Sequence, residues 1–281
     1  MNAARPSALD ANADAPAAAH APVIIAVTAR DRARDALKRA FPKRRTALAF
    51  CRTSVELGEA LRRELVDAVV VDVGQPADDT WKSVALARDF PSIPFFSLGS
   101  ARVGDGATLA RCAGAEFADL LTEGIDDASL RDLVLPHCFT HRFSQSLRDA
   151  PAALGLDAPL QRGAWEALVQ FGGRTVRTES LAALLGVTRE HLSRSFAASG
   201  APNLKRIIDL VRLIAAAELS KNPGYDVSDV AQILDFASAS HLGSTALRIV
   251  GARTASLARL RTVDLIDRFQ QGRGRSRRAV R

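Results

Sequence analysis

Four polar or basic side chains lie close together between residues 188 and 196 and could contact nucleic acid. Leu192 and Phe196 are four residues apart, so they share one face of a predicted helix. Short polar and basic side chains on the free face of a turn-linked helix suit the base edges of a DNA major groove. A solvated helical hairpin is the alternative, since polar helix faces are common. The candidate DNA-binding residues are Arg189, His191, Ser193 and Arg194.

These side chains need a preceding helix and a tight turn to present them. Thr178 is a good N-cap for a helix with apolar residues at 181–185, and Gly186 ends it. Thr188 then caps the helix that carries the candidate residues. The segment therefore predicts two short helices joined by a turn.

A second copy of this pattern follows. Asp226 or Ser228 can cap a helix, Asp235 and Phe236 form a turn, and Ser238 can cap a further helix. Two such units are far less expected by chance than one. The second unit contributes the candidate DNA-binding residues Ser240, His241 and Ser244.

One long amphipathic helix separates the two units. Asn203 begins it, and the run from Asn222 to Gly224 ends it. A helix of about 16 residues spans about 24 Å. It could hold two recognition helices in successive major-groove segments, about 34 Å apart. Its apolar stripe is Leu204, Ile207, Ile208, Val211, Ile214 and Ala215.

Residues 162 to 262 resemble the AraC/XylS-type DNA-binding domain. The similarity runs through "SLAALLGVTREHLSRSF", "LKRIIDLVRLIAAAEL" and "VSDVAQILDFASASHLGSTALRIVG". The resemblance implies that both helix-turn-helix units contact promoter DNA and that the first gives the firmer base contacts. Family signature positions are occupied by Arg212, Phe236, Ser240, His241 and Gly251.

The departures from that family lie in the second unit. Asp235 replaces the usual glycine before the phenylalanine, Ser244 replaces an arginine, and Thr254 replaces a proline. Leu242 and Ala246 stand at later aromatic positions. The second unit is therefore expected to read DNA weakly or mainly to hold the backbone. Asp235 would repel phosphate unless it is paired or caps a helix.

The N-terminal half alternates apolar runs with helical patterns. Five such alternations predict an α/β doubly wound parallel sheet, flavodoxin-like, ahead of an all-α C-terminal domain with two helix-turn-helix units. The predicted strands are at residues 23–27, 47–50, 68–73, 94–98 and 116–121. Helical segments are expected around residues 33–40, 55–65, 80–89, 107–112 and 128–135.

This half resembles a response-regulator receiver domain through "VDAVVVDVG", "IPFFSLGS" and "GAEFADLLTEG". The resemblance puts Asp72 at the phosphoacceptor position. Thr28 and Ala29 replace the acid pair that binds Mg²⁺, Gly99 replaces a hydroxyl residue, and Glu123 with Gly124 replaces lysine and proline.

One aspartate is a poor site for Mg²⁺, which prefers several oxygen ligands. Glu123 would also give the pocket the wrong charge for a phosphoryl group. Asp31 could partly substitute for the missing acids. The favoured interpretation is a vestigial phosphoacceptor in a phosphorylation-independent receiver-like domain, kept for dimerisation or for partner or signal input.

Charge is divided unequally along the chain of 281 residues. Residues 1–150 hold 19 Lys plus Arg against 20 Asp plus Glu, a net of −1, and residues 151–281 hold 19 against 11, a net of +8. The basic excess suits an anionic partner for the C-terminal half. Three widely spaced cysteines fit a reducing cytoplasm, and no run reaches the length of a membrane helix.

The remaining segments complete the expected organisation. Residues 1–21 should be a disordered tail, 22–136 the receiver-like domain, 137–160 a linker, 161–265 the DNA-binding domain and 266–281 a disordered basic tail that contacts phosphates or only aids solubility. His137, Cys138 and His141 could bind a metal, but a helix end is the favoured interpretation. Neither a metal nor another cofactor is expected.

The sequence supports two hypotheses about function. The first is a bacterial, cytoplasmic, nucleoid-associated transcription regulator that binds double-stranded promoter DNA, with a possible homodimer or regulatory partner protein. The second is a protein-interaction or scaffold module with only weak nonspecific DNA binding. An enzyme is not expected, because no Gly-rich phosphate loop, nucleophile elbow or paired-carboxylate site is present.

Overall fold

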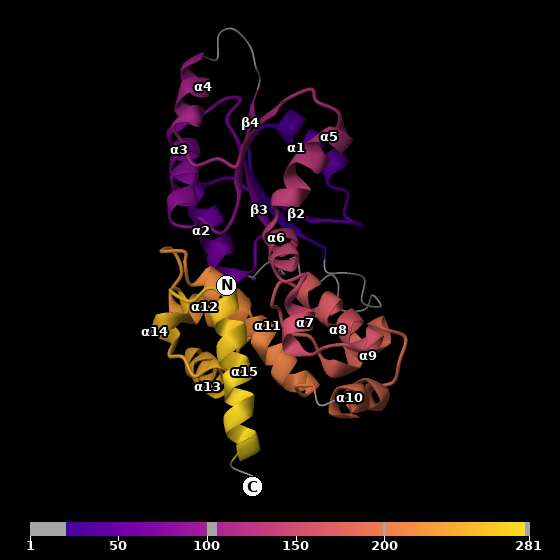
Figure 1. Cartoon of the computed structure of the whole chain (residues 1–281). Helices are drawn as coiled ribbons and strands as arrows, with labels where there is room; N and C mark the ends of the chain where they lie inside the picture. Colours follow the sequence, from indigo (N-terminus) through magenta and orange to yellow (C-terminus); the bar gives the residue numbers. More distant parts are fainter. Residues whose placement is uncertain (1–20, 100–105, 199–200, 279–281) are drawn as a thin grey trace, which may run out of the picture.

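Five short strands form one parallel sheet in the computed structural model, which describes residues 21–99, 106–198 and 201–278 (Figure 1). The strand order is β2-β1-β3-β4-β5, and every pairing is parallel. Such an order belongs to doubly wound, flavodoxin-like sheets, so the predicted receiver-like fold of this half is confirmed. The strands are β1 Val23–Val27, β2 Ala47–Cys51, β3 Ala68–Asp72, β4 Phe95–Gly99 and β5 Asp119–Thr122.

Helices cover both faces of the sheet, with α1 and α5 on one side and α2, α3 and α4 on the other (Figure 1). Successive strand residues point to opposite faces. Ile24 accordingly packs with the α1 and α5 residues, and Ile25 with those of α2. Burial on both faces explains the continuous apolar runs of these strands. The helices are α1 Asp31–Ala40, α2 Ser54–Arg63, α3 Asp78–Ala85 with the 3₁₀ turn η2 Leu86–Arg88, α4 Gly106–Ala113 and α5 Asp127–Val134.

The expected linker at residues 137–160 is instead folded. A 3₁₀ turn η4 (Leu135–His137) leads into α6 (Phe139–Ser146) and α7 (Ala150–Leu154). The prolines that suggested a linker, Pro151 and Pro159, lie in the first turns of α7 and α8. Proline is favoured there because the first helical N–H groups need no intrahelical partner. The Trp165 indole also donates a hydrogen bond to the Leu147 carbonyl at 3.1 Å, which fixes this segment to the helices that follow.

The C-terminal half is helical, as predicted, and contains two pairs of helices joined by short turns. The first pair is α9 and α10, the second is α12 and α13, and α11 lies between them. The predicted caps at Thr188, Asn203, Asp226 and Ser238 are all present. Helix α9 differs, because Thr178 is its first residue and not its N-cap. The helices are α8 Pro159–Gln170, α9 Thr178–Leu184, α10 Arg189–Ala198, α11 Leu204–Leu219, α12 Val227–Ile233, α13 Ala239–Val250, α14 Thr254–Leu257 and α15 Thr262–Arg278.

The C-terminal segment also differs from expectation, because α15 continues the helix as far as Arg278. Leu265 and Phe269 are fully buried on its inner face, and the helix packs on α11 and α13. These contacts explain why the chain remains helical past residue 265. The expected tail at residues 1–20 and the last three residues, 279–281, lie outside the described part of the chain.

The hydrophobic cluster on the α2 face of the sheet continues into the helical half, whereas the α1 and α5 face has a cluster of its own. The shared cluster runs from Ile25 and Phe95 in the sheet to Phe236 and Phe269 in the helical half. Within residues 21–99, 106–198 and 201–278, no helix has the length and apolar character needed to cross a membrane.

Candidate nucleic-acid interface and acidic pocket

Helix α10 presents all four predicted residues of the first pair to solvent. Leu192 and Phe196 are fully buried, which turns the opposite face outward. Arg189 forms an exposed ion pair with Glu179 at 3.0 Å. His191 and Ser193 make no side-chain hydrogen bond within the described residues. The four side chains Arg189, His191, Ser193 and Arg194 are therefore all exposed on this helix, around the part of its surface that Leu192 and Phe196 leave free.

Helix α13 also exposes its predicted residues, but two of them are engaged locally. The Ala237 N–H donates to His241 Nδ1 at 3.4 Å, and the His241 ring meets Phe236 edge-on. Ser244 Oγ donates to the His241 carbonyl at 3.0 Å. Ser240 is exposed as well. The exposed side chains of α13 are therefore less available to a ligand than those of α10, because His241 and Ser244 already have local partners.

Two further residues of α13 are exposed beside the predicted DNA-binding residues, although the sequence analysis did not include them in that set. Leu247 is 55% exposed, and Arg248 donates from Nη2 to Asp209 Oδ2 on α11 at 2.9 Å. Spacing could have indicated both, because they continue the helix face of Ser244 at three and four residues. The ion pair ties the one arginine of α13 to the neighbouring helix.

Helix α11 is a rigid connection between the pairs, since most of its 16 residues are buried. Arg212 reaches from it to the second pair. Its guanidinium lies 3.8 Å from the Phe236 ring centroid and donates to the Leu234 carbonyl at 2.8 Å. The family-like arginine therefore holds the α12–α13 turn and does not face solvent, being 8% exposed.

Asp235 has a structural reason to differ from the family's glycine. It is the one non-glycine residue with positive φ among those described, at 54°. Aspartate tolerates this left-handed conformation better than most residues. Its charge raises the pKa of the buried Arg174 and Arg212, although burial lowers both pKa values more strongly. Asp235 therefore lies close enough to both arginines to oppose, in small part, the effect of burial.

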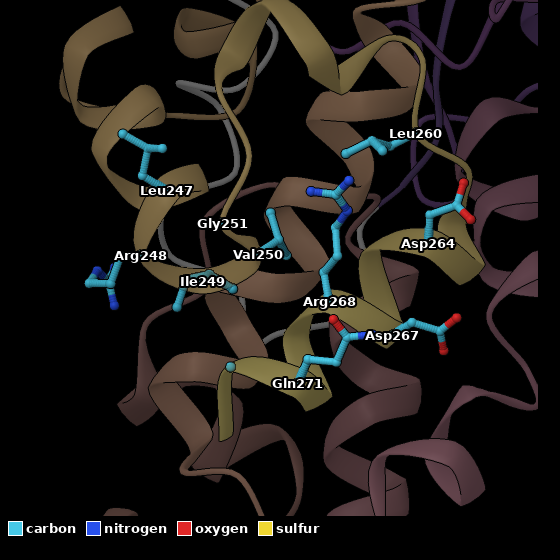
Figure 2. Close-up of a pocket in the computed structure, with 11 residues that line it drawn as sticks. Leu247, Arg248, Ile249, Val250, Gly251, Leu260, Asp264, Asp267, Arg268 and Gln271 are labelled. Carbon is cyan, nitrogen blue, oxygen red and sulfur yellow. The ribbon is translucent and has the colours of Figure 1, made fainter. Parts of the chain in front are cut away.

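Helices α10 and α13 both lie in the part of the molecule away from the sheet (Figure 1). An open groove of about 770 Å³ borders α13 and α15 (Figure 2). Its lining mixes apolar residues with Arg248, Asp264, Asp267 and Arg268. Small-molecule sites are predominantly apolar, so this charged groove does not resemble a cofactor site.

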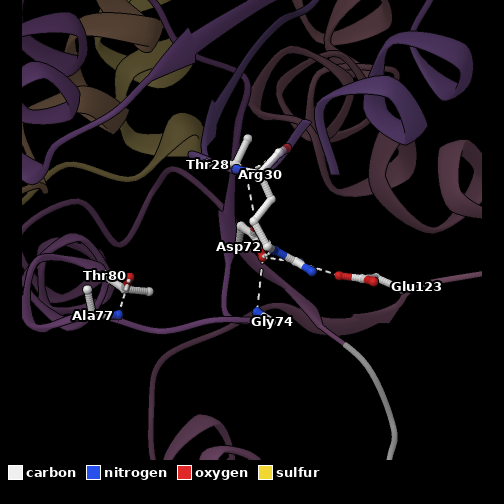
Figure 3. Close-up of polar contacts among 7 residues, drawn as sticks. All are labelled: Thr28, Arg30, Asp72, Gly74, Ala77, Thr80 and Glu123. Atoms are coloured by element: carbon white, nitrogen blue, oxygen red, sulfur yellow. Dashed lines mark hydrogen bonds and ion pairs between the residues drawn. The ribbon is translucent and has the colours of Figure 1, made fainter. Parts of the chain in front are cut away.

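The predicted phosphoacceptor Asp72 lies at the end of β3 and is 7% exposed. Thr28 Oγ1 donates to Asp72 Oδ2 at 2.5 Å, and the Gly74 N–H donates to Oδ1 at 3.0 Å (Figure 3). Both carboxylate oxygens thus accept hydrogen bonds from neighbouring loops. Asp31, the possible substitute for the missing acids, is exposed at the start of α1.

Arg30 fills the space between the two acids of this pocket. Its Nε lies 2.8 Å from Asp72 Oδ2, and its Nη2 contacts both Asp72 and Glu123 (Figure 3). A Cβ at position 74 would collide with the guanidinium, so Gly74 makes room for it. Hydrogen bonding to Asp72 raises the pKa of Arg30, and Glu123 adds to this effect while burial opposes it. The pocket therefore contains its own permanent cation.

Sequence reasoning missed Arg30. The available signal was an unbalanced pair of acids, Asp72 and Glu123, at the carboxyl ends of β3 and β5. Buried charges are normally paired, so a cation from a neighbouring loop was required. Arg30 lies three residues after the end of β1, the strand that pairs with β3, and so belongs to a loop at that edge.

The predicted metal candidates are not brought together as a site. His137 and His141 are exposed, whereas Cys138 is 2% exposed. Burial raises the pKa of Cys138, and it also raises that of Cys51, to about 11. Over the described ranges, no group of three or more His, Cys, Asp or Glu side chains is placed to hold a metal ion.

No family model matches the chain. No curated protein matches it either.

Three solved structures show similarity to parts of the chain. A response regulator from Thermotoga maritima is 22% identical over 42% of this chain and 97% of its own, with a TM-score of 0.36. Full-length FixJ from B. japonicum is 14% identical over 71% and 97%, with a TM-score of 0.37. The response regulator StyR is 14% identical over 68% and 98%, with a TM-score of 0.35.

Proposed function

We propose that the protein is a sequence-specific DNA-binding transcription regulator whose two helix pairs act as AraC/XylS-type helix-turn-helix units. One observation carries the proposal: α10 and α13, the second helices of the two pairs, both expose polar faces and are joined through the buried helix α11. Two recognition helices joined by a rigid helix could enter successive major-groove segments on one side of a duplex.

The charge distribution supports DNA as the partner. Residues 151–281 have a net charge of +8, from 19 Lys plus Arg against 11 Asp plus Glu. A basic surface attracts phosphate and steers association, whatever the sequence of the duplex. Base recognition then depends on the side chains that α10 and α13 present.

The first helix-turn-helix unit supplies most base contacts in this proposal. His191 and Ser193 are exposed and form no side-chain hydrogen bond within the described residues. In the second unit, by contrast, His241 and Ser244 have local partners and Arg248 is paired with Asp209. Binding DNA there would require breaking those contacts first, so the second unit mainly holds the phosphate backbone.

The receiver-like half acts without phosphorylation in this account. Arg30 bridges Asp72 and Glu123, and it occupies the space that a divalent cation and a phosphoryl group would need. Phosphoryl transfer depends on a metal ion that bridges and neutralises the phosphate oxygens. The guanidinium, which is bonded to both oxygens of Asp72, would have to be displaced before a metal ion could bind there, and this supports the proposal.

The receiver-like half instead serves dimerisation or input from a partner protein or signal. Exposed leucines on and beside the edge strand β5 offer an apolar contact surface: Leu109 on α4 is 41% exposed, Leu120 on β5 41% and Leu133 on α5 36%. Pairing two chains would double the number of DNA contacts. The protein acts in the cytoplasm on the chromosome and catalyses no reaction in this proposal.

A scaffold module with weak nonspecific DNA binding is the second candidate. The Arg248–Asp209 ion pair favours it, because the arginine of α13 is then held away from DNA. Under this alternative, the helical half would bind any duplex through phosphate alone, and its main partner would be a protein bound to the receiver-like half.

Selection from a random duplex library tests the proposal and separates it from the alternative. Purified full-length protein is used at about 150 mM salt, which suppresses nonspecific phosphate attraction. A recovered motif with two contact regions about one helical turn apart supports the regulator. A single short half-motif leaves only the first unit as a base reader. No enrichment over bulk DNA favours the scaffold.

A further inference from the structure

The receiver-like half touches the helical half at the turn after α11, residues 222–225, called the junction turn below. Asn222 Oδ1 accepts a hydrogen bond from the Ser92 N–H at 2.7 Å. The Gly224 N–H donates to the Asp89 carbonyl at 2.8 Å. Both partners lie in the loop that precedes β4, so this loop holds the junction turn through one side-chain contact and one backbone contact.

An aromatic contact reinforces these hydrogen bonds. The rings of Phe90 and Tyr225 meet edge-on with centroids 4.8 Å apart, and both side chains are buried. A Cβ built at Gly224 would lie 2.5 Å from the Phe90 ring. Glycine therefore allows close approach of the turn to the ring, and a larger residue here must displace either the Phe90 ring or the turn.

Further buried contacts lie beside the junction turn. Helix α12 packs on α2. Arg174 Nη2 donates to the Leu65 carbonyl at 2.7 Å and lies 3.6 Å from Asp67 Oδ2. Asp67 is fully buried and also accepts from the Thr140 N–H at 2.8 Å. Paired buried charges of this kind are costly to separate, so the junction resists sliding.

The receiver-like half contacts the second helix pair more closely than the first. Helix α12 belongs to the second pair and packs directly on the receiver-like half, whereas α9 and α10 of the first pair pack on α8. Helix α13 therefore packs on α11 and α15 within the helical half and on α12, and α12 links it to the receiver-like half.

We propose that the junction turn positions the second helix-turn-helix unit and so sets the spacing of the two contact regions on DNA. Gly224, Phe90 and Asn222 are positioning residues in this account, since they act through α12 and α13 and do not touch the ligand. The inference rests on the proposed function. Two linked modules gain affinity only when both can engage at once, so a misdirected α13 would forfeit that gain.

The test compares full-length wild type with Gly224→Ala, which wedges a methyl group against Phe90. Spin labels on cysteines introduced at Ser193 and Ser244 report the distance between α10 and α13 by pulsed electron resonance. We expect the variant's distance distribution to shift or broaden. Its affinity for the selected two-contact duplex should fall at least about tenfold, while affinity for a duplex with only the first half-site stays within about twofold.

Two further variants distinguish a specific effect of Gly224→Ala from general unfolding. Phe90→Leu combined with Gly224→Ala makes room for the methyl group and should restore part of the affinity and the distance. Gly163→Ala, on α8 with only an ordinary 3.5 Å contact, is the matched glycine control and should change neither.

An unchanged label distance in folded Gly224→Ala would overturn the proposal, as would equal losses on full and half sites. The distance readout needs no DNA. A shifted distance in a protein that selects no DNA motif would therefore sink the proposed function while leaving the positioning role intact.

Discussion

Among individual residues, Arg194 is the main candidate for a base contact in the proposed function. It is an exposed cation in the middle of α10, and its side chain makes one hydrogen bond among the described residues, a long contact from Nε to the Glu190 carbonyl at 3.4 Å. Arginine forms bidentate contacts with guanine, and these discriminate strongly between bases.

Arg194→Ala should weaken binding to the selected duplex by about 1–3 kcal/mol and relax specificity at one base position. Fluorescence anisotropy on duplexes substituted one base pair at a time measures both effects. Arg148→Ala, another exposed arginine outside the two helix pairs, is the control. A loss of equal size on every sequence would assign Arg194 to a phosphate instead.

If the receiver-like half acts without phosphorylation, as proposed, removing the carboxylate of Asp72 should leave regulation unchanged, because Asp72 then serves only as a partner of Arg30. Asp72→Asn and wild type should give the same reporter expression and the same affinity for DNA. Circular dichroism confirms that the variant is folded. Loss of regulation in a folded Asp72→Asn protein would contradict the phosphorylation-independent account.

Arg30→Met should destabilise the protein by about 1–3 kcal/mol, since it leaves Asp72 and Glu123 facing each other without a cation. The double variant Arg30→Met, Asp72→Asn should lose less unfolding free energy than the two single variants together, because both changes remove the same interaction. Urea unfolding gives the free energies. Strict additivity would mean that the ion pair adds no stability.

At the scale of elements, the α12–α13 turn depends on a strained backbone position. Asp235 has φ of 54° and lies near two buried arginines, Arg174 and Arg212. Asp235→Ala should destabilise the fold by about 1–2 kcal/mol, because alanine tolerates this conformation less well and carries no charge. Asp235→Asn loses only the charge and should be less harmful. Thermal unfolding of the two variants checks this order, and a more stable Ala variant would refute the explanation.

The elements themselves were largely predictable, because their signals are local. The apolar run Val23–Val27 forms a buried parallel strand, and Asn203, Asp226 and Ser238 cap the helices that they were expected to cap. Residues 137–160 were misassigned as a linker because prolines mark helix starts as well as loops. Only the burial of Phe139 distinguishes the two outcomes, and burial depends on tertiary packing.

Contacts between distant residues could not be predicted in the same way. Arg30 and Asp72 are 42 residues apart, and the Ser92–Asn222 hydrogen bond spans 130 residues. Each contact depends on how helices and strands that are distant in sequence pack together. Hydrophobic periodicity and helix caps are local signals and do not report such packing. The exposed face of α10 was predictable in full, whereas the local partners of His241 and Ser244 required the structure.

At the scale of the whole molecule, the two halves share a hydrophobic cluster and should unfold together. Scanning calorimetry should show one transition with equal calorimetric and van't Hoff enthalpies. Cooperative coupling is expected because the junction includes the buried Asp67–Arg174 pair as well as apolar contacts. Two separate transitions would show that the halves behave as independent domains.

The most direct test of the central claim is the ratio of affinities for two duplexes of equal length at about 150 mM salt. One carries the motif recovered by library selection, and the other the same bases in scrambled order. We predict that wild-type protein binds the motif at least about a thousandfold more tightly, the lower end of specific recognition. Equal affinities would show that the helical half binds phosphate alone, and the regulator proposal would then be wrong.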